Sequence, residues 1–166
     1  NGQIFTKNED ETDDLVAAGN APENAYSGCA WIDYDNDGNL DLFWVRSGLY
    51  HNNGSGKFEL ITNSHMRTDA GFGTTWADFN NDGWLDIYFG NETRRDTEKY
   101  PCELFISDGK GKFKNAGKDS GAGILCFAKG VAASDYNNDG YKDLFVTNGY
   151  LRDFTSLDFL KYKVED

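Results

Sequence analysis

The sequence predicts an all-β protein built from β-propeller blades of four antiparallel strands. An acidic nine-residue motif occurs three times, as DYDNDGNLD from Asp33, DFNNDGWLD from Asp78 and DYNNDGYKD from Asp135. The first aspartates are spaced by 45 and then 57 residues, a range typical of propellers and solenoids. In addition, 19 glycines with only 2 prolines indicate many tight turns.

Apolar segments on both sides of each motif are interpreted as strands. LYHNNGSGKFEL (49–60) and LFISDGKGKFKN (104–115) each combine an apolar pair, a Gly-rich turn and Lys-Phe, which indicates a β-hairpin. Four antiparallel strands per unit make a propeller blade, which needs stacked neighbours to bury both faces. The predicted strands lie near 29–33, 40–46, 49–52 and 57–62 in the first unit, and near 74–79, 84–89, 102–107 and 112–115 in the second.

The chain is divided into propeller repeats (1–150) and a C-terminal tail (151–166). The repeat units lie near 28–62, 73–117 and 130–150. A short C-terminal helix is predicted, because four apolar residues of the tail share one helical face: Phe154, Leu157, Leu160 and Val164. Closed propellers have about four to eight blades. We therefore expect a partial propeller or a segment of a larger one, completed by the remaining blades of a longer chain or by neighbouring subunits.

Charge and cysteine content exclude several classes of partner. The net charge of −12 repels nucleic acid and anionic lipid. No apolar run approaches the roughly 20 residues of a membrane span, so no membrane insertion is expected. The three cysteines leave two alternatives open, a Cys102–Cys126 bridge or three buried thiols that include Cys29. No CxxC motif is present, so zinc is not expected.

The acidic motif has the composition and spacing of a loop that wraps Ca²⁺, giving about three sites. Calcium takes roughly six to eight oxygen ligands, which alternate side chains of a loop can supply. Positions 1, 3, 5 and 9 would provide side-chain oxygens, namely Asp33, Asp35, Asp37 and Asp41, then Asp78, Asn80, Asp82 and Asp86, then Asp135, Asn137, Asp139 and Asp143. Position 7 would provide a backbone carbonyl, from Asn39, Trp84 and Tyr141. Glycine stands at position 6, where the chain turns sharply: Gly38, Gly83 and Gly140.

Three alternatives to a calcium loop agree less well with the motif. Magnesium demands octahedral geometry and retains its waters, so a site rich in protein oxygens favours calcium. Runs of Asp, Asn and Gly also form ordinary turns, but three runs in one register favour a bound ion. EF-hand loops need a carboxylate at position 12, where this chain has Trp44, Phe89 and Val146. Three Ca²⁺ ions would change the formal charge from −12 to −6 and stabilise the fold.

The segments WIDYDNDGNLDLFWV, WADFNNDGWLDIYFGNE and ASDYNNDGYKDLFVTNG resemble FG-GAP/VCBS repeats, which occur in integrin α-subunit propellers. The similarity covers residues 1 to about 150 and is closest to proteins of the ASPIC/UnbV and cartilage-acidic type. It implies a propeller, usually seven-bladed, with calcium in the loop between the first two strands of a blade. It also implies an extracellular, periplasmic or cell-surface location, and the loop ligands named above.

No catalytic constellation is recognised in the sequence. His51 and His65 lack a nucleophile or an orienting carboxylate that the sequence can place beside them. We therefore expect a protein that is not an enzyme and that acts in adhesion, scaffolding or binding of a protein or glycan ligand. The alternative is a carbohydrate-binding or polysaccharide-cleaving module on the same fold, since Trp84 and Tyr141 could stack on a sugar or instead cover the loops. Three tryptophans are predicted between blades: Trp31, Trp44 and Trp76.

Overall fold

The computed structural model describes residues 28–45, 48–66, 73–91 and 100–149, which are almost entirely β-structure. The strands of the first repeat are β1 (Cys29–Ile32), β2 (Asp41–Trp44), β3 (Gly48–Asn52) and β4 (Phe58–Leu60). Those of the second are β5 (Gly73–Ala77), β6 (Asp86–Gly90), β7 (Glu103–Ser107) and β8 (Phe113–Asn115). A single helical turn, α2 (Gly117–Ser120), leads to β9 (Ala128–Ser134) and β10 (Asp143–Asn148).

The strands form three antiparallel sheets, each built from consecutive strands. Blade 1 has the order β1-β2-β3-β4 and blade 2 the order β5-β6-β7-β8. Blade 3, as far as the described residues extend, is the pair β9–β10. The predicted all-β class with four-stranded antiparallel blades is confirmed, and the eight strands predicted in the first two repeats are each present within two residues of their expected ends.

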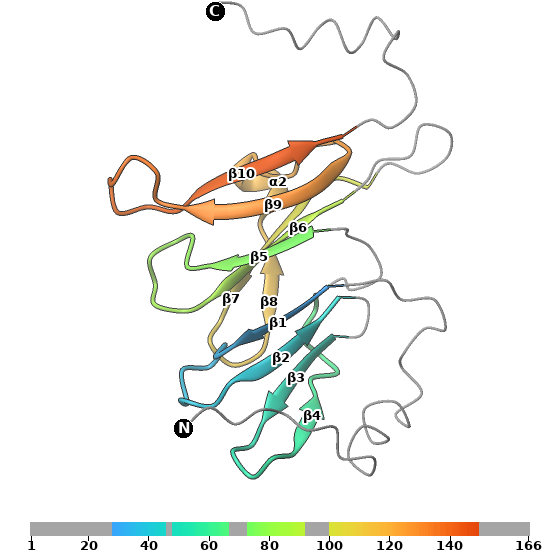
Figure 1. The fold of residues 1–166 in the computed structure, drawn as a ribbon, viewed down its shortest axis with the longest axis vertical. Helices are drawn as coiled ribbons and strands as arrows, with labels where there is room; N and C mark the ends of the chain where they lie inside the picture. The colour runs from blue at the N-terminus through green and yellow to red at the C-terminus, as the bar shows by residue number, and fades with distance from the viewer. Residues whose placement is uncertain (1–27, 46–47, 67–72, 92–99, 150–166) are drawn as a thin grey trace, which may run out of the picture.

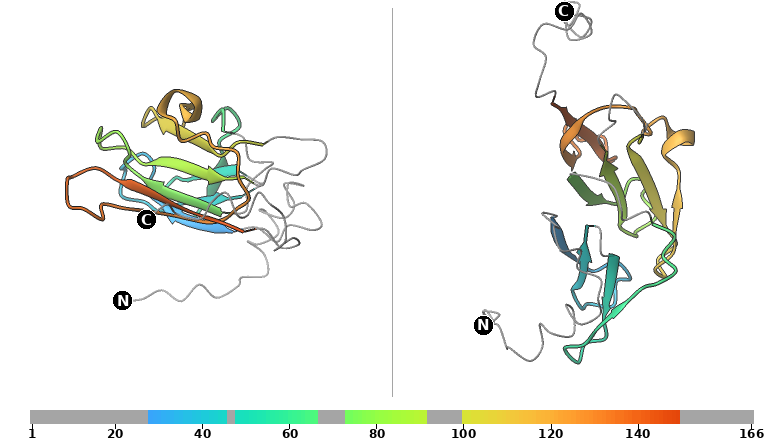
Figure 2. Two further views of the ribbon diagram at one scale, coloured as in Figure 1. Left: turned by 90° about the horizontal axis from the view of Figure 1, so that it is seen from above. Right: turned by 90° about the vertical axis from the view of Figure 1, so that its right-hand side faces the viewer.

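The three blades follow one another in chain order, with their first strands on a common side (Figures 1 and 2). The loops β1–β2, β5–β6 and β9–β10 all project from the same edge of this stack (Figure 1). These three loops are the acidic motifs. Blade stacking therefore brings together segments that are far apart in the sequence.

Aromatic rings fill the space between blades 1 and 2. Phe43 on β2 is fully buried, and its ring centroid lies 5.3 Å from that of Trp76 and 5.8 Å from that of Phe89, both in edge-to-face geometry. Phe113 packs against Trp76 at 5.9 Å. Aliphatic and aromatic side chains from both sheets complete this core, including Ile32, Tyr34, Leu49, Ile87 and Phe105. Such ring pairs add to the stabilisation from burial of apolar area.

Blades 2 and 3 pack closely because a glycine on β6 leaves room for β9, the first strand of blade 3. A Cβ atom on Gly90 would lie 2.8 Å from Cγ1 of Val131 and 2.9 Å from Cβ of Ala128. Both partners belong to β9, so the absence of a side chain on β6 permits the contact. Beside it, Tyr88 is 1% exposed and packs in a cluster with Cys102, Leu104 and Ala128.

The structure also corrects or extends several expectations. The prediction that the strand tryptophans lie between blades is confirmed for Trp76, whereas Trp31 is 47% exposed because no described blade precedes β1. The turn α2 was not predicted. The C-terminal helix predicted for residues 151–166 lies outside the described residues, and the division at residue 150 remains a prediction. None of the described residues forms a helix long and apolar enough to cross a membrane.

We predict that Cys102 and Cys126 form a disulfide on slow aerobic oxidation at alkaline pH. Their Sγ atoms lie 3.3 Å apart as free thiols, and closure needs about 2.05 Å. Burial raises the pKa of Cys126 to about 12, which keeps the reactive thiolate scarce near neutrality. Dioxygen would accept the two electrons and two protons.

The measurement is alkylation of the denatured chain followed by peptide mass analysis. Oxidised protein should be labelled only at Cys29, which is exposed and serves as the internal control. Fully reduced protein should be labelled at all three cysteines. Equal labelling of the three before and after oxidation would contradict the prediction.

Candidate metal centre

Each acidic loop connects the first two strands of a blade and is closed by its first aspartate. In loop 1, the two carboxylate oxygens of Asp33 accept hydrogen bonds from the backbone N–H groups of Asp37 and Gly38, at 3.1 and 3.0 Å. In loop 2, Asp78 accepts from Asp82 and Gly83 at 3.1 and 2.8 Å. In loop 3, Asp135 accepts from Asp139 and Gly140 at 3.0 and 2.9 Å. One carboxylate thus fixes the turn in the same way three times.

Two residues per loop adopt left-handed backbone conformations. The glycine at position 6 has φ of 88°, 92° and 89° in the three loops, at Gly38, Gly83 and Gly140. Position 4 is Asn in each loop, with φ of 55°, 58° and 59° at Asn36, Asn81 and Asn138. Asn tolerates this region better than most residues with a side chain, which explains the recurrence of Asn there.

Carboxylates at the centre of the loops are held by backbone donors. Asp37 accepts a hydrogen bond of 2.7 Å from the N–H of Asn39, and Asn39 Nδ2 donates to its second oxygen at 3.0 Å. These bonds lower the pKa of Asp37, so it remains ionised at neutral pH. Asp82 and Asp139 accept the corresponding backbone bonds from Trp84 and Tyr141, both at 2.9 Å.

The ninth-position aspartates tie loops 1 and 2 to their sheets. Asp41 has no exposed surface and accepts from the N–H groups of Tyr34 and Asn52, at 3.2 and 2.7 Å. Asp86 is equally buried and accepts from Phe79 and Ser107 at 2.9 and 2.8 Å. Desolvation raises the pKa of both carboxyls against the effect of these hydrogen bonds. A nearby cation would relieve that desolvation penalty.

The geometry of loop 1 fits a calcium ion. Ligand oxygens of Asp33, Asp35 and Asp41 all lie within 4.8 Å of one another. Oxygens bound to one Ca²⁺ at about 2.3–2.6 Å can be at most about 5 Å apart, so this separation suits a shared ion. Loops 2 and 3 have the same backbone pattern, with the amides of Asn80 and Asn137 at position 3. The carbonyls of Asn39, Trp84 and Tyr141 remain predicted ligands.

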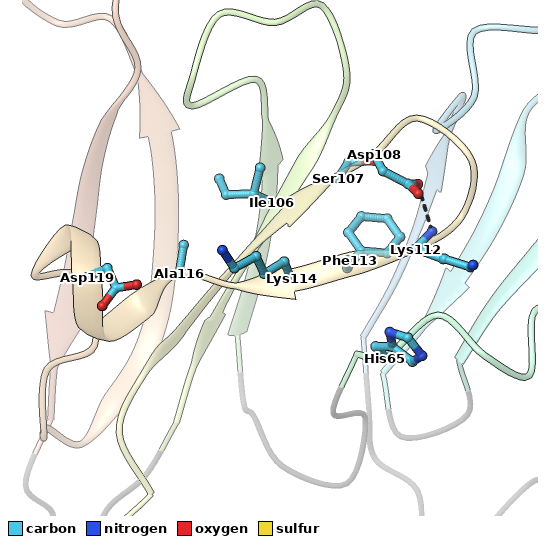
Figure 3. Close-up of a pocket in the computed structure, with 9 residues that line it drawn as sticks. All are labelled: His65, Ile106, Ser107, Asp108, Lys112, Phe113, Lys114, Ala116 and Asp119. Carbon is cyan, nitrogen blue, oxygen red and sulfur yellow. Dashed lines mark hydrogen bonds between the residues drawn. The ribbon is translucent and has the colours of Figure 1, made fainter.

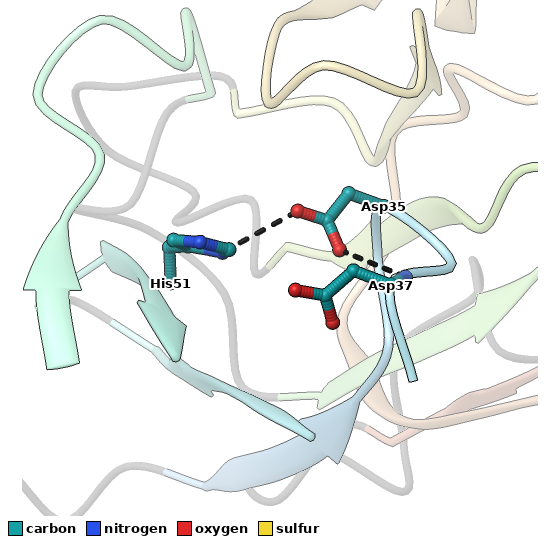
Figure 4. Close-up of side chains that lie close together, drawn as sticks. All are labelled: Asp35, Asp37 and His51. Carbon is teal, nitrogen blue, oxygen red and sulfur yellow. Dashed lines mark hydrogen bonds and ion pairs between the residues drawn. The ribbon is translucent and has the colours of Figure 1, made fainter. Parts of the chain in front are cut away.

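His51 is a neighbour of loop 1 that sequence reasoning did not place there. Its Nδ1 atom lies 3.4 Å from Oδ2 of Asp35 (Figure 4) and 3.3 Å from Oδ1 of Asp41, which the figure does not draw. Antiparallel pairing of β2 with β3 brings the end of β3 beside the start of β2, which was the available signal. When protonated, the imidazolium would offset part of the negative charge of this loop.

A pocket of about 470 Å³ lies along β7 and β8 of blade 2. His65, Phe113, Lys114 and Asp119 are among its lining residues (Figure 3). The carboxylate of Asp108, also at the wall, accepts bonds from the backbone of Lys110 and Lys112 at 2.8 and 3.1 Å, so it is engaged in the hairpin turn.

Residues 33–89 match the model of the FG-GAP-like repeat family. The chain carries an FG-GAP-like repeat. The matched region begins at the first aspartate of loop 1 and ends on β6, so it includes two of the three acidic loops. This match confirms, for residues 33–89, the resemblance to FG-GAP repeats inferred from the sequence. No curated protein matches the chain.

We predict that Asp86→Ala lowers the free energy of unfolding by about 2–4 kcal/mol, because it leaves the buried N–H group of Ser107 and the half-buried N–H group of Phe79 without an acceptor. Asp86→Asn retains one acceptor oxygen and should lose less. Denaturant unfolding in chelator measures the change without any contribution from metal.

Asp143→Ala is the matched control for Asp86→Ala. Asp143 occupies position 9 of loop 3, is only partly buried and accepts a weaker bond of 3.3 Å from the N–H of Tyr136. Asp143→Ala should lower the free energy of unfolding clearly less than Asp86→Ala does. Equal decreases in the free energy of unfolding for Asp86→Ala and Asp143→Ala would contradict the claim that burial of the carboxylate determines the size of the effect.

Proposed function

We propose that this chain is a calcium-binding β-propeller segment, with one ion in each acidic loop. The observation that supports the proposal is that one loop geometry occurs three times. In each loop the carboxylate of the first aspartate closes the turn, and further side-chain oxygens that could bind a metal stand at positions 3, 5 and 9. In loop 1, three carboxylates approach closely enough to share an ion. Oxygen donors are the ligands that Ca²⁺ prefers.

Calcium would act on the electrostatics of the loop edge. Net charge is −12, and the three loops project from one edge of the stack (Figure 1). Without a cation, ionised aspartates within a loop repel one another. An ion that binds the folded loops and not the unfolded chain stabilises the fold by mass action. Calcium therefore has a structural role in this proposal.

The proposed setting is a secreted or cell-surface protein, extracellular or periplasmic. FG-GAP repeats typically occur in extracellular proteins, which supports this location. The segment would act without catalysis, in adhesion, scaffolding or binding of a protein ligand. Its structural partners would be the remaining blades of a longer chain or neighbouring subunits, with no role for nucleic acid.

One observation favours a second candidate function, carbohydrate binding. Tyr141 at position 7 of loop 3 is 61% exposed, and an exposed aromatic ring can stack on a sugar. Trp84, at the same position of loop 2, is engaged differently: a Cβ atom on Gly109 would lie 2.4 Å from its indole ring, so the ring covers the β7–β8 turn. A sugar site would therefore involve Tyr141 rather than Trp84.

We expect removal of calcium by a chelator to lower the melting temperature by about 5 °C or more. Saturation at about 100 times Kd contributes roughly 2.7 kcal/mol per site, and each kcal/mol is worth about 2–4 °C for a chain of this size. Differential scanning calorimetry with calcium and with chelator is the measurement. Superimposable curves would refute calcium binding.

Loop variants locate the effect of calcium on the melting temperature. Asp37→Ala, Asp82→Ala and Asp139→Ala should each reduce the calcium-dependent shift by about one third, since each removes a ligand from one site. Asp119→Ala removes the same charge from α2, outside the loops, and should leave the shift intact. Loss of the shift in Asp119→Ala as well would indicate a general charge effect.

A glycan array in excess calcium separates the two candidate functions. We expect no reproducible binding, since the segment is proposed to bind a protein or to act as a scaffold. Binding to one glycan class that is lost in Tyr141→Ala and retained in Trp84→Ala would establish the second candidate. The melting temperatures measured with calcium and with chelator test calcium binding independently of the glycan array.

A further inference from the structure

Loops of adjacent blades are joined by one repeated hydrogen bond. Asn36 Nδ2 donates to the carbonyl of Gly83 at 3.0 Å, and Asn81 Nδ2 donates to the carbonyl of Gly140 at 3.1 Å. Position 4 of one loop thus bonds to position 6 of the next. Asn138 occupies the donor position of loop 3, and no described loop follows it. The carbonyl of Gly38 occupies the acceptor position of loop 1, and no described loop precedes it.

The packed side chains follow the same register as the loops. Phe43, Tyr88 and Phe145 each lie two residues after the ninth-position aspartate. Phe43 is fully buried against blade 2 and Tyr88 is 1% exposed within the cluster that packs on blade 3. Phe145 on β10 is 69% exposed. Blade 2 covers this face of blade 1, and blade 3 covers it on blade 2. On blade 3 the same face is exposed to solvent at Phe145.

The opposite end of the stack presents the complementary face. Trp31 and Trp76 each lie two residues before the first aspartate of their loop. Trp76 receives the ring of Phe43 from the preceding blade, whereas Trp31 is 47% exposed and contacts Phe58 of its own blade at 5.8 Å. Successive side chains of a strand point to opposite faces, and Ile32 packs in the core with blade 2. Trp31 accordingly faces away from blade 2.

We propose that two copies of this chain associate head to tail, with blade 3 of one copy against blade 1 of the next. Phe145 packs on Trp31 of the second copy, as Phe43 packs on Trp76 between blades 1 and 2. Asn138 donates to the carbonyl of Gly38, as Asn36 and Asn81 donate at the two internal interfaces. The contact is heterologous, so it extends to further copies or closes into a ring. The inference builds on the proposal that additional blades complete the stack, and it specifies a second copy as their source.

Sedimentation velocity of the full chain over a range of concentrations tests the proposal. The average mass should rise with concentration, and it should rise further in high salt, which screens the repulsion between copies with a net charge of −12. Phe145→Ser and Asn138→Ala change exposed residues and should weaken association, the first by at least about tenfold. Leu125→Ser, a control at a residue 55% exposed outside both faces, should associate like the wild type.

A mixing experiment distinguishes head-to-tail contact from other association. Phe145→Ser retains the blade 1 face and Trp31→Ser retains the blade 3 face, so each alone should be monomeric. Their mixture should give a one-to-one dimer that grows no further. A monomeric mixture of folded variants would overturn the proposal, as would undiminished association of Phe145→Ser. A monomeric wild type at all concentrations would also overturn it, and would assign the face to residues 150–166 or to a different protein.

Failure of association and failure of calcium binding have separate readouts. Association is measured by mass, and calcium binding by the chelator-dependent melting temperature. A chain that is monomeric but melts earlier in chelator would reject only the head-to-tail contact. A chain that associates but melts identically in chelator would reject only the calcium proposal.

Discussion

The structure depends on carboxylates that hold the backbone N–H groups of three short loops. The first aspartate of each loop closes the turn, and in loops 1 and 2 the ninth joins it to the sheet. Because ionised carboxylates accept strong hydrogen bonds, the loops are ordered by their own charges. The same charges repel one another at short range. A doubly charged cation bound at the centre, as proposed, would resolve this conflict and so link the fold to the proposed function.

The fixed conformation of each loop also contributes to the contact between neighbouring blades. The fourth-position Asn can reach the next loop only if its own loop is fixed, and it then donates to a glycine carbonyl of the following blade. Below these polar contacts, the ring of Phe43 meets Trp76 in an edge-to-face arrangement. The loop hydrogen bonds and the packed aromatic residues therefore occur at fixed positions relative to the acidic motif. At both ends of the described stack the aromatic positions are partly exposed, at Trp31 and Phe145.

Much of this architecture could be predicted from local sequence. The threefold motif predicted the loops, and alternating apolar residues with Gly-rich turns predicted the strands, because both signals arise within a few residues. Burial of Asp41 and Asp86 could not be predicted, since it depends on N–H donors from Asn52 on β3 and Ser107 on β7. Likewise, the hydrogen bond from the Asn at position 4 could not be predicted, because its acceptor belongs to another blade.

The most direct test of the central claim is a crystal structure grown in calcium, with an anomalous difference map calculated at a wavelength where calcium scatters. We expect one peak in each loop, surrounded by oxygens of the named aspartates and asparagines at about 2.3–2.6 Å. Loops that retain the carboxylate-to-amide hydrogen bonds but show no peak, or only water at hydrogen-bond distances, would contradict it.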